Sequence, residues 1–399
     1  MASGWWRMLI SLAIGAASLG AALYAQSIPL SADRLLAGAP GHIVPPPPEL
    51  VPQGVSVPPM PKQLTAAQRK QLSSSLWYEP LSQKLVNLLY VDTVVTTGRN
   101  QSSRAVARIL AALGWRFTQA QQNLMLHDAL EGQFVGVLDH ADALLRRQKL
   151  MQEAMQMLLN MEAVPQVHHL VVERLLTSPW WRTAYLQRIA PQTPANIIEA
   201  RRQTMLTLIQ SPAGVTRVEL SEILGALVAT GRGRAGYALW RQYVGEPLDN
   251  QLVYDPQFKH AAAARSEDRF PFEWHLNQNV GYSAVAGPQG AMISWDGRGV
   301  PVFMNQMVPV TPGARYLLSI EGSASGGRLQ ELFAPTLGCS EAILPFSVQA
   351  GNAGKIAVFQ SPPVPKGCTL ANLAIAGRVD TGARNVTINV HRITLRPRP

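Results

Sequence analysis

Carboxylates in the last third of the chain are the residues best suited to hydrolytic chemistry. A glycosidase needs two carboxylates that face each other across the bond to be broken. Residues 270–399 offer only isolated candidates, which are Glu273, Asp296, Glu321, Glu331, Glu341 and Asp380. Because isolated carboxylates on strands are usually solvated, we do not expect a catalytic pair among them.

Signatures of other catalytic and cofactor sites are missing from the sequence or stand in the wrong context. The sequence contains no G-x-S-x-G elbow, Walker sequence or H-E-x-x-H. Residues 231–236 (GRGRAG) match the dinucleotide fingerprint, but they follow a helical pattern, so they predict a turn between two helices. His168 and His169 are adjacent and point to different faces of a predicted helix, which disfavours a metal site. We expect no enzyme activity, cofactor or bound metal.

Aromatic side chains near these carboxylates are candidates for binding sugar. The C–H faces of sugar rings stack on Trp or Tyr, while polar neighbours bind the hydroxyl groups. The candidates are Trp295, Tyr282 and Trp274, together with Asp296 beside Trp295 in a predicted turn. Alternatively, Trp274 anchors the seam between two domains and Tyr282 fills the core of its own domain. Trp295 is therefore the foremost candidate for a stacking surface.

The elements that would position these residues are short strands. Alternating stretches rich in Val, Ile, Tyr and Phe, separated by Gly and Pro turns, fill residues 270–396. This pattern predicts about eight antiparallel strands in a jelly-roll-like β-sandwich. The two cysteines of the chain, Cys339 and Cys368, flank predicted strands in this region. We expect a structural disulfide between them, which would fit an oxidising compartment.

Helices are predicted upstream of the strands, over residues 64–245. Apolar residues recur there at spacings of three and four, with short interruptions by Gly, Pro or Ser. Residues 130–145 and 227–240 each pass from one helix through Gly into a second. Such hairpins cannot bury their apolar faces alone, so we expect them to stack as a repeat-like domain that binds a protein partner through its concave face.

The N-terminal sequence has the architecture of an export signal. Residues 8–24 contain no charge and follow a short tail with one arginine, which fits either a cleaved signal peptide or a retained anchor. Trp5, Trp6 and Tyr24 suit the two membrane interfaces and favour a retained transmembrane helix. Residues 40–61 contain nine prolines and predict a semi-rigid spacer. We expect the tail to stay in the cytoplasm and the rest of the chain to be exported.

Composition excludes two classes of protein. With 47% hydrophobic and 15% charged residues, the chain is not wholly disordered. Its net charge of +10 is spread along the sequence, and its longest basic runs are pairs such as Arg146-Arg147. A nucleic-acid-binding protein would concentrate these charges, so we expect no nucleic-acid partner and only a general attraction to anionic surfaces.

Several local motifs resemble one family of envelope proteins. Residues 255–258 (DPQF), residues 270–274 (FPFEW), Gly338-Cys339 and Gly367-Cys368 are similar to the join and sandwich of sphingomonad-type envelope proteins that are often encoded with exopolysaccharide functions. The helical hairpins resemble the tetratricopeptide-like region of the same family. The resemblance covers about residues 70–396 and implies a fold similar to carbohydrate-binding modules. It also implies a single-pass protein of the bacterial inner membrane, with most of the chain in the periplasm.

These observations together predict a multidomain α plus β chain. We expect a membrane anchor at residues 1–25, a Pro-rich linker at 26–63, a helical domain at 64–245, a joining segment at 246–269 and a β-sandwich at 270–399. The leading hypothesis is a non-catalytic scaffold for exopolysaccharide or envelope assembly, with a protein partner from the secretion or polysaccharide machinery. The alternatives are a dedicated polysaccharide-binding protein and a glycan-active enzyme.

Overall fold

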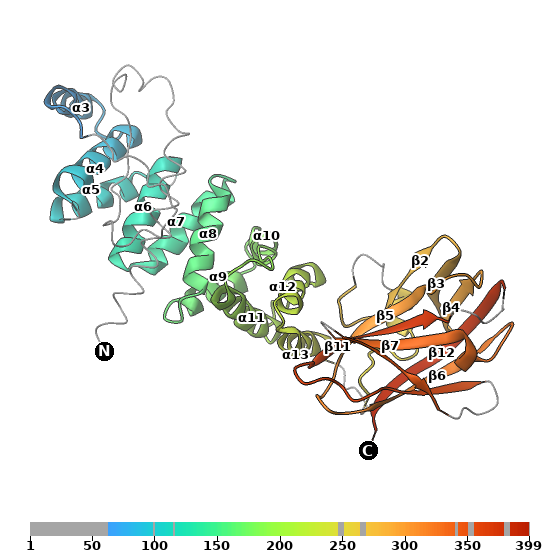
Figure 1. Ribbon diagram of the computed structural model, residues 1–399. Coiled ribbons are helices and arrows are strands. Elements are labelled where there is room, and N and C mark those ends of the chain that lie inside the picture. Colours follow the sequence, from blue (N-terminus) through green and yellow to red (C-terminus); the bar gives the residue numbers. More distant parts are fainter. Residues whose placement is uncertain are drawn as a thin grey trace. The chain divides into compact units, whose positions relative to one another are not determined.

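The computed structural model describes residues 63–98, 100–114, 116–245, 251–263, 269–339, 342–349, 355–378 and 384–398. The chain divides into two compact units. Unit 1 comprises the described residues up to Tyr185 together with Pro194–Ala213, and unit 2 comprises Leu186–Thr193 and the described residues from Gly214 onward. The first half of the chain is helical and the second half contains antiparallel sheets, so this part of the predicted fold class is confirmed (Figure 1).

Unit 1 is built from successive helices. They are α3 (Ala66–Tyr78), α4 (Gln83–Thr97), α5 (Gln101–Ala112), α6 (Thr118–Glu131), α7 (Phe134–Arg146), α8 (Met151–Glu162), α9 (His168–Leu176), α10 (Arg182–Leu186) and α11 (Ala195–Ile209). Polar residues start several of them: the Asn100 side chain accepts hydrogen bonds from the backbone of Ser102 and Ser103 at the beginning of α5. Gly132 ends α6 in the left-handed region, with φ of 74°.

A fully buried ion pair joins α8 to α11. The Arg201 guanidinium donates to the Glu162 carboxylate at 2.7 Å, and both side chains are 0% exposed. The hydroxyls of Tyr185 and Thr204 also donate to Glu162, each at 2.6 Å. Burial alone raises the pKa of Glu162, but the charge of Arg201 and these hydrogen bonds lower it below its usual value. Sequence periodicity did not predict this cluster.

Unit 2 contains two antiparallel sheets. The strands are β1 (His275–Leu276), β2 (Gln278–Asn279), β3 (Tyr282–Gly287), β4 (Gly290–Trp295), β5 (Val302–Pro309), β6 (Tyr316–Ala324), β7 (Phe333–Cys339), β8 (Ala342–Pro345), β9 (Ser347–Val348), β10 (Ile356–Gln360), β11 (Leu370–Gly377) and β12 (Val386–Pro397). Within the described residues, one sheet has the order β1-β5-β11-β7-β8 and the other β2-β3-β4-β12-β6-β10-β9. Buried residues from both sheets, such as Ile293 and Leu373, belong to one core.

The described residues of unit 2 also form the helices α12 (Arg217–Ala229), α13 (Gly233–Val244), α14 (Lys259–Ala263) and the short α15 (Leu329–Leu332). In the first turn of α12, Arg217 pairs with Glu273 at 2.6 Å. Trp240 on α13 is fully buried and contacts Tyr254 and Phe272, with ring centroids 4.9 and 5.4 Å away. The helices α12 and α13, which lie inside the predicted helical domain 64–245, are therefore packed into the unit that contains the sheets.

The predicted membrane segment cannot be compared with the structure. Residues 1–25, and all but the last residue of the predicted linker 26–63, lie outside the described residues. Among the helices of the described residues, none combines the length and the apolar character needed to cross a membrane.

The buried ion pair leads to a prediction about stability. The Glu162→Gln substitution removes the negative charge facing buried Arg201, so it should lower the free energy of unfolding by about 3 to 5 kcal/mol, measured by urea denaturation at neutral pH. The matched control is Glu199→Gln, because Glu199 pairs with Arg202 on a half-exposed surface of α11. That substitution should cost at most about 1 kcal/mol.

The lowered pKa of folded Glu162 sets the pH dependence. The stabilisation is present above the ordinary glutamate pKa, about 4.3, and is lost as the pH falls through the lower folded value. Glu162→Gln should lack this component of the acid sensitivity. Equal stability of Glu162→Gln and the wild type would contradict the role assigned to the pair.

Candidate functional site

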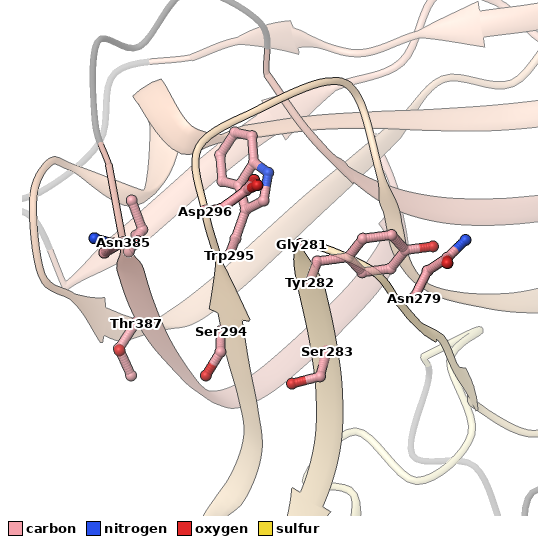
Figure 2. Close-up of a pocket in the computed structure, with 10 residues that line it drawn as sticks. Asn279, Gly281, Tyr282, Ser283, Ser294, Trp295, Asp296, Asn385 and Thr387 are labelled. Atoms are coloured by element: carbon pink, nitrogen blue, oxygen red, sulfur yellow. The ribbon is translucent and has the colours of Figure 1, made fainter.

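A pocket of about 410 Å³ lies at one end of the seven-stranded sheet of unit 2 (Figure 2). Its lining comes from the turn between β2 and β3, the end of β4 and the beginning of β12. Three of the four residues predicted to contact sugar line it, namely Tyr282, Trp295 and Asp296. The fourth, Trp274, is not among the lining residues.

Strand register places a row of hydroxyl groups along the pocket. Ser283 on β3 pairs with Ser294 on β4, and Ser294 pairs with Thr387 on β12. Successive side chains of a strand point to opposite faces, and the buried neighbours of these residues face the core. The three hydroxyls therefore share the outer face of the sheet, on three adjacent strands (Figure 2). Nothing in the sequence marks these three residues as neighbours, because they come together only through strand pairing.

Asp296 is held at the rim of the pocket by local hydrogen bonds. Its backbone N–H donates to the Gly281 carbonyl at 2.9 Å, and its Oδ1 accepts from the Arg298 N–H at 2.9 Å. Gly281 has φ of 87°, and a Cβ added there would lie 2.8 Å from Asp296 Oδ2. Glycine at this position therefore permits both the turn and the close approach of the carboxylate.

Trp295 is a core residue rather than a surface for stacking sugar. It is 2% exposed, and its ring packs edge to face on Phe303 with centroids 5.6 Å apart. Its indole N–H donates to the Arg298 carbonyl at 2.9 Å. The expectation that Trp295 presents an open ring face in a turn is wrong, because Trp295 ends β4 on the same inward face as Ala291 and Ile293. Alternation along β4 is the signal that could have shown this.

The other two aromatic candidates differ from each other. Trp274 is 1% exposed, donates its indole N–H to the Asp255 carbonyl at 3.1 Å and packs on Phe258 within the core of unit 2. It has no ring face available to a ligand. Tyr282 is half-buried, and its ring meets Phe303 edge to face at 6.0 Å while also lining the pocket. Tyr282 therefore fills part of the core and contributes to the pocket at the same time.

Much of the pocket's polar surface has no hydrogen-bonding partner within the part of the chain that the structure describes. This holds for the side-chain hydroxyls of Tyr282 and of the row formed by Ser283, Ser294 and Thr387, and for the side-chain amide of Asn385. Hydroxyl and amide groups can both donate and accept. The pocket thus offers a ligand several hydrogen-bonding groups beside one partly exposed aromatic ring.

The carboxylates do not form a facing pair in the described residues. Asp296 is the single carboxylate among the residues that line the pocket. Glu273 pairs with Arg217 of α12, Glu331 pairs with Arg328, and Glu321 lies on β6 away from the pocket. Glu341 and Asp380 lie outside the described residues. Among the described carboxylates of residues 270–399, none other than Asp296 lines the pocket.

The glycine-rich motif at residues 231–236 and the adjacent histidines are parts of helices and turns. Residues 231 and 232 lie in the turn between α12 and α13, and residues 233–236 begin α13. The predicted turn between two helices is thus present, and the motif does not follow a strand as a phosphate loop would. His168 and His169 begin α9, and His168 Nδ1 lies 2.8 Å from the Glu162 carbonyl. Across the described residues, no group of three or more His, Cys, Asp or Glu side chains could hold a metal ion.

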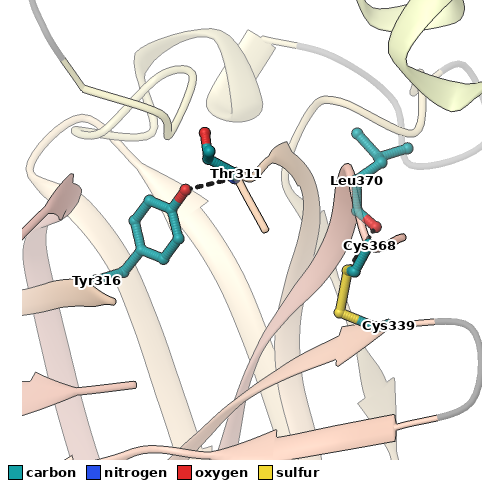
Figure 3. Close-up of a disulfide and its surroundings, with 5 residues drawn as sticks. All are labelled: Thr311, Tyr316, Cys339, Cys368 and Leu370. Carbon is teal, nitrogen blue, oxygen red and sulfur yellow. Dashed lines mark hydrogen bonds between the residues drawn. A yellow bond between two sulfur atoms is a disulfide. The ribbon is translucent and has the colours of Figure 1, made fainter. Parts of the chain in front are cut away.

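The predicted disulfide between Cys339 and Cys368 is confirmed, with the Cα atoms 5.8 Å apart (Figure 3). Cys339 ends β7 and Cys368 shortly precedes β11, the strand that pairs with β7. Close by, the Thr311 N–H donates to the Tyr316 hydroxyl at 2.7 Å (Figure 3). Closing the loop between the cysteines adds about 3 to 4 kcal/mol in the chain-entropy model. The bond belongs to the fold and lies outside the lining of the pocket.

Comparisons with known proteins give no family. No protein-family model and no curated protein matches the sequence. Among solved structures, the chain aligns with a family GH115 4-O-methyl-alpha-glucuronidase with specificity for decorated arabinogalactans, at 9% identity and a TM-score of 0.20. The alignment covers 77% of this chain and 44% of the other. A TM-score this low carries no argument about fold or activity.

The core position of Trp295 gives a direct test. Trp295→Ala should lower the free energy of unfolding of unit 2 by about 3 to 5 kcal/mol, because it removes a large buried side chain. Met292→Ala on the same strand is the control, since Met292 is 50% exposed and its loss should change stability by about 0.5 kcal/mol or less. Urea denaturation followed by circular dichroism measures both. A Trp295→Ala protein as stable as the control would show that the ring lies at the surface.

Proposed function

We propose that this protein is a non-catalytic, membrane-anchored envelope scaffold whose two-sheet unit binds carbohydrate in the pocket beside Tyr282. The observation that carries the proposal is a set of hydroxyl and amide groups that have no side-chain hydrogen-bond partner among the described residues and that surround a partly exposed aromatic ring. Sugar hydroxyls donate and accept hydrogen bonds, and sugar C–H groups pack on aromatic faces or edges. The volume, about 410 Å³, falls within the range of small-ligand pockets, roughly 300 to 1,000 Å³.

The proposed location follows from the N-terminal sequence. An uncharged stretch at residues 8–24, followed by a Pro-rich segment, supports a single-pass anchor in a bacterial inner membrane with the bulk of the chain in the periplasm. The disulfide between Cys339 and Cys368 supports an oxidising compartment. The resemblance to envelope proteins encoded with exopolysaccharide functions supports the same assignment.

The helical part of the chain would supply the protein contacts of the scaffold. A tetratricopeptide-like stacking of unit 1 and a jelly-roll-like path through the sheets are the finer forms of the fold that we propose. Helical arrays of this kind bind proteins along an extended surface. A component of the secretion or polysaccharide machinery would be the partner, and the net charge of +10 would favour anionic envelope surfaces over a defined nucleic-acid site.

A dedicated polysaccharide-binding protein is the second candidate, and the pocket itself favours it. The two candidates differ in whether unit 1 has a partner of its own. A glycan-active enzyme is the weakest candidate because Asp296 stands alone among the lining residues. Turnover of a glycan by the wild type, abolished in Asp296→Asn, would favour the enzyme over both binding functions.

Binding is tested by affinity electrophoresis of the full chain in detergent, through gels cast with the host's exopolysaccharide. Thr387→Val replaces a hydroxyl of the pocket with a methyl group of similar shape. It should weaken retention about fivefold, the effect of one lost hydrogen bond worth roughly 1 kcal/mol. The control is Thr394→Val, further along the same strand β12 and outside the pocket lining.

Retention that falls in Thr387→Val and stays unchanged in Thr394→Val supports carbohydrate binding in this pocket. Equal migration of the wild type in gels with and without polysaccharide would remove the carbohydrate function. It would leave a scaffold that works through protein contacts alone.

A further inference from the structure

Two apolar side chains continue the pocket along the outer face of the sheet. Val285 on β3 and Met292 on β4 are 44% and 50% exposed and are direct partners in the strand register. Each lies two residues along its strand from the hydroxyl of Ser283 or Ser294, which is about 7 Å and leaves it on the same face. Val285 and Met292 therefore form a small apolar patch beside the polar pocket.

The apolar patch formed by Val285 and Met292 is small and has polar neighbours. On the side of β12, Met292 pairs with exposed Asn389, and Asn389 pairs in turn with exposed Ser323 on β6. A large protein interface would need a wider apolar area than two side chains provide. A single sugar ring presents an apolar C–H face edged by hydroxyl groups, which matches an apolar pair with an amide beside it.

The charge of the pocket restricts the kind of sugar. Asp296 accepts a hydrogen bond from the Arg298 backbone N–H, and within the described residues its carboxylate forms no ion pair with a basic side chain. A uronic acid or another anionic sugar in the pocket would meet a like charge, whereas the hydroxyls of a neutral sugar can donate to the carboxylate.

We propose that this surface recognises a run of neutral sugar units in a polysaccharide chain lying along β3 and β4. One unit occupies the polar pocket, where its hydroxyls bind Asp296 and the hydroxyl row, and the next unit lies on Val285 and Met292. This inference rests on the proposed carbohydrate function and adds the charge and the minimum length of the ligand. The attraction of the basic chain to acidic envelope surfaces is then separate from recognition in the pocket.

The charge is tested with two forms of one polymer and the full chain in detergent. The host's exopolysaccharide is compared with a carboxyl-reduced sample if it contains uronic acids, or with a sample oxidised at its primary alcohols if it does not. The wild type should bind the neutral form at least about tenfold more tightly, which corresponds to roughly 1.4 kcal/mol. Asp296→Asn should reduce this preference, because asparagine keeps an acceptor for the Arg298 N–H while removing the charge.

The length is tested with fragments of the neutral polymer. Met292→Gln should weaken binding of a hexasaccharide about fivefold, as expected from the loss of roughly 40 Å² of apolar contact, and leave binding of a monosaccharide unchanged. Met307→Gln, on β5 of the other sheet and half-exposed, is the control and should affect neither ligand.

The possible results distinguish a failure of this inference from a failure of the proposed carbohydrate binding. Tighter binding of the anionic form by the wild type, or an undiminished hexasaccharide affinity in Met292→Gln, would overturn the inference while leaving carbohydrate binding in place. No binding of either polymer form by the folded wild type would overturn the proposed function itself.

Discussion

The burial of Trp295 between the two sheets fixes the geometry of the pocket. Its ring packs on Phe303, and a Cβ at Gly377 would lie 3.1 Å from the same ring, so the indole has little freedom to turn outward. Because neighbouring side chains of a strand face opposite ways, inward Trp295 directs Ser294 to the outer face. Its bond to the Arg298 carbonyl also holds the turn that orients Asp296. Trp295 therefore contributes to the pocket mainly by positioning Ser294 and Asp296.

In unit 1, a buried ion pair holds two helices together. Glu162 and Arg201 are fully removed from water, and the hydroxyls of Tyr185 and Thr204 complete the hydrogen bonding of the carboxylate. A buried pair of this kind gives little net stability compared with apolar residues, but losing one partner is costly. It therefore penalises any other packing of α8 and α11. The pair joins α8 to α11 within unit 1.

The sequence alone was enough to predict which parts of the chain form helices or strands and to predict the disulfide. Periodicities of 3.6 and 2 separate the helical half from the sheets, and two cysteines leave a single possible intramolecular pair. It was insufficient for the pocket, because Ser283, Ser294 and Thr387 are ordinary strand residues that become neighbours only through pairing of β12 with β4. The placement of α12 and α13 in unit 2 also escaped prediction, since it depends on contacts such as Trp240 with Phe272. Helical periodicity does not show which partner a helix packs against.

Amide hydrogen exchange would show whether carbohydrate binds on the outer face of the seven-stranded sheet. The full chain in detergent is compared with and without saturating neutral exopolysaccharide. We expect slower exchange in peptides covering residues 279–285, 292–296 and 385–389, because a bound ligand suppresses local opening of the strands it contacts. Unchanged exchange in those peptides, with protection confined to the helices of unit 1, would contradict it.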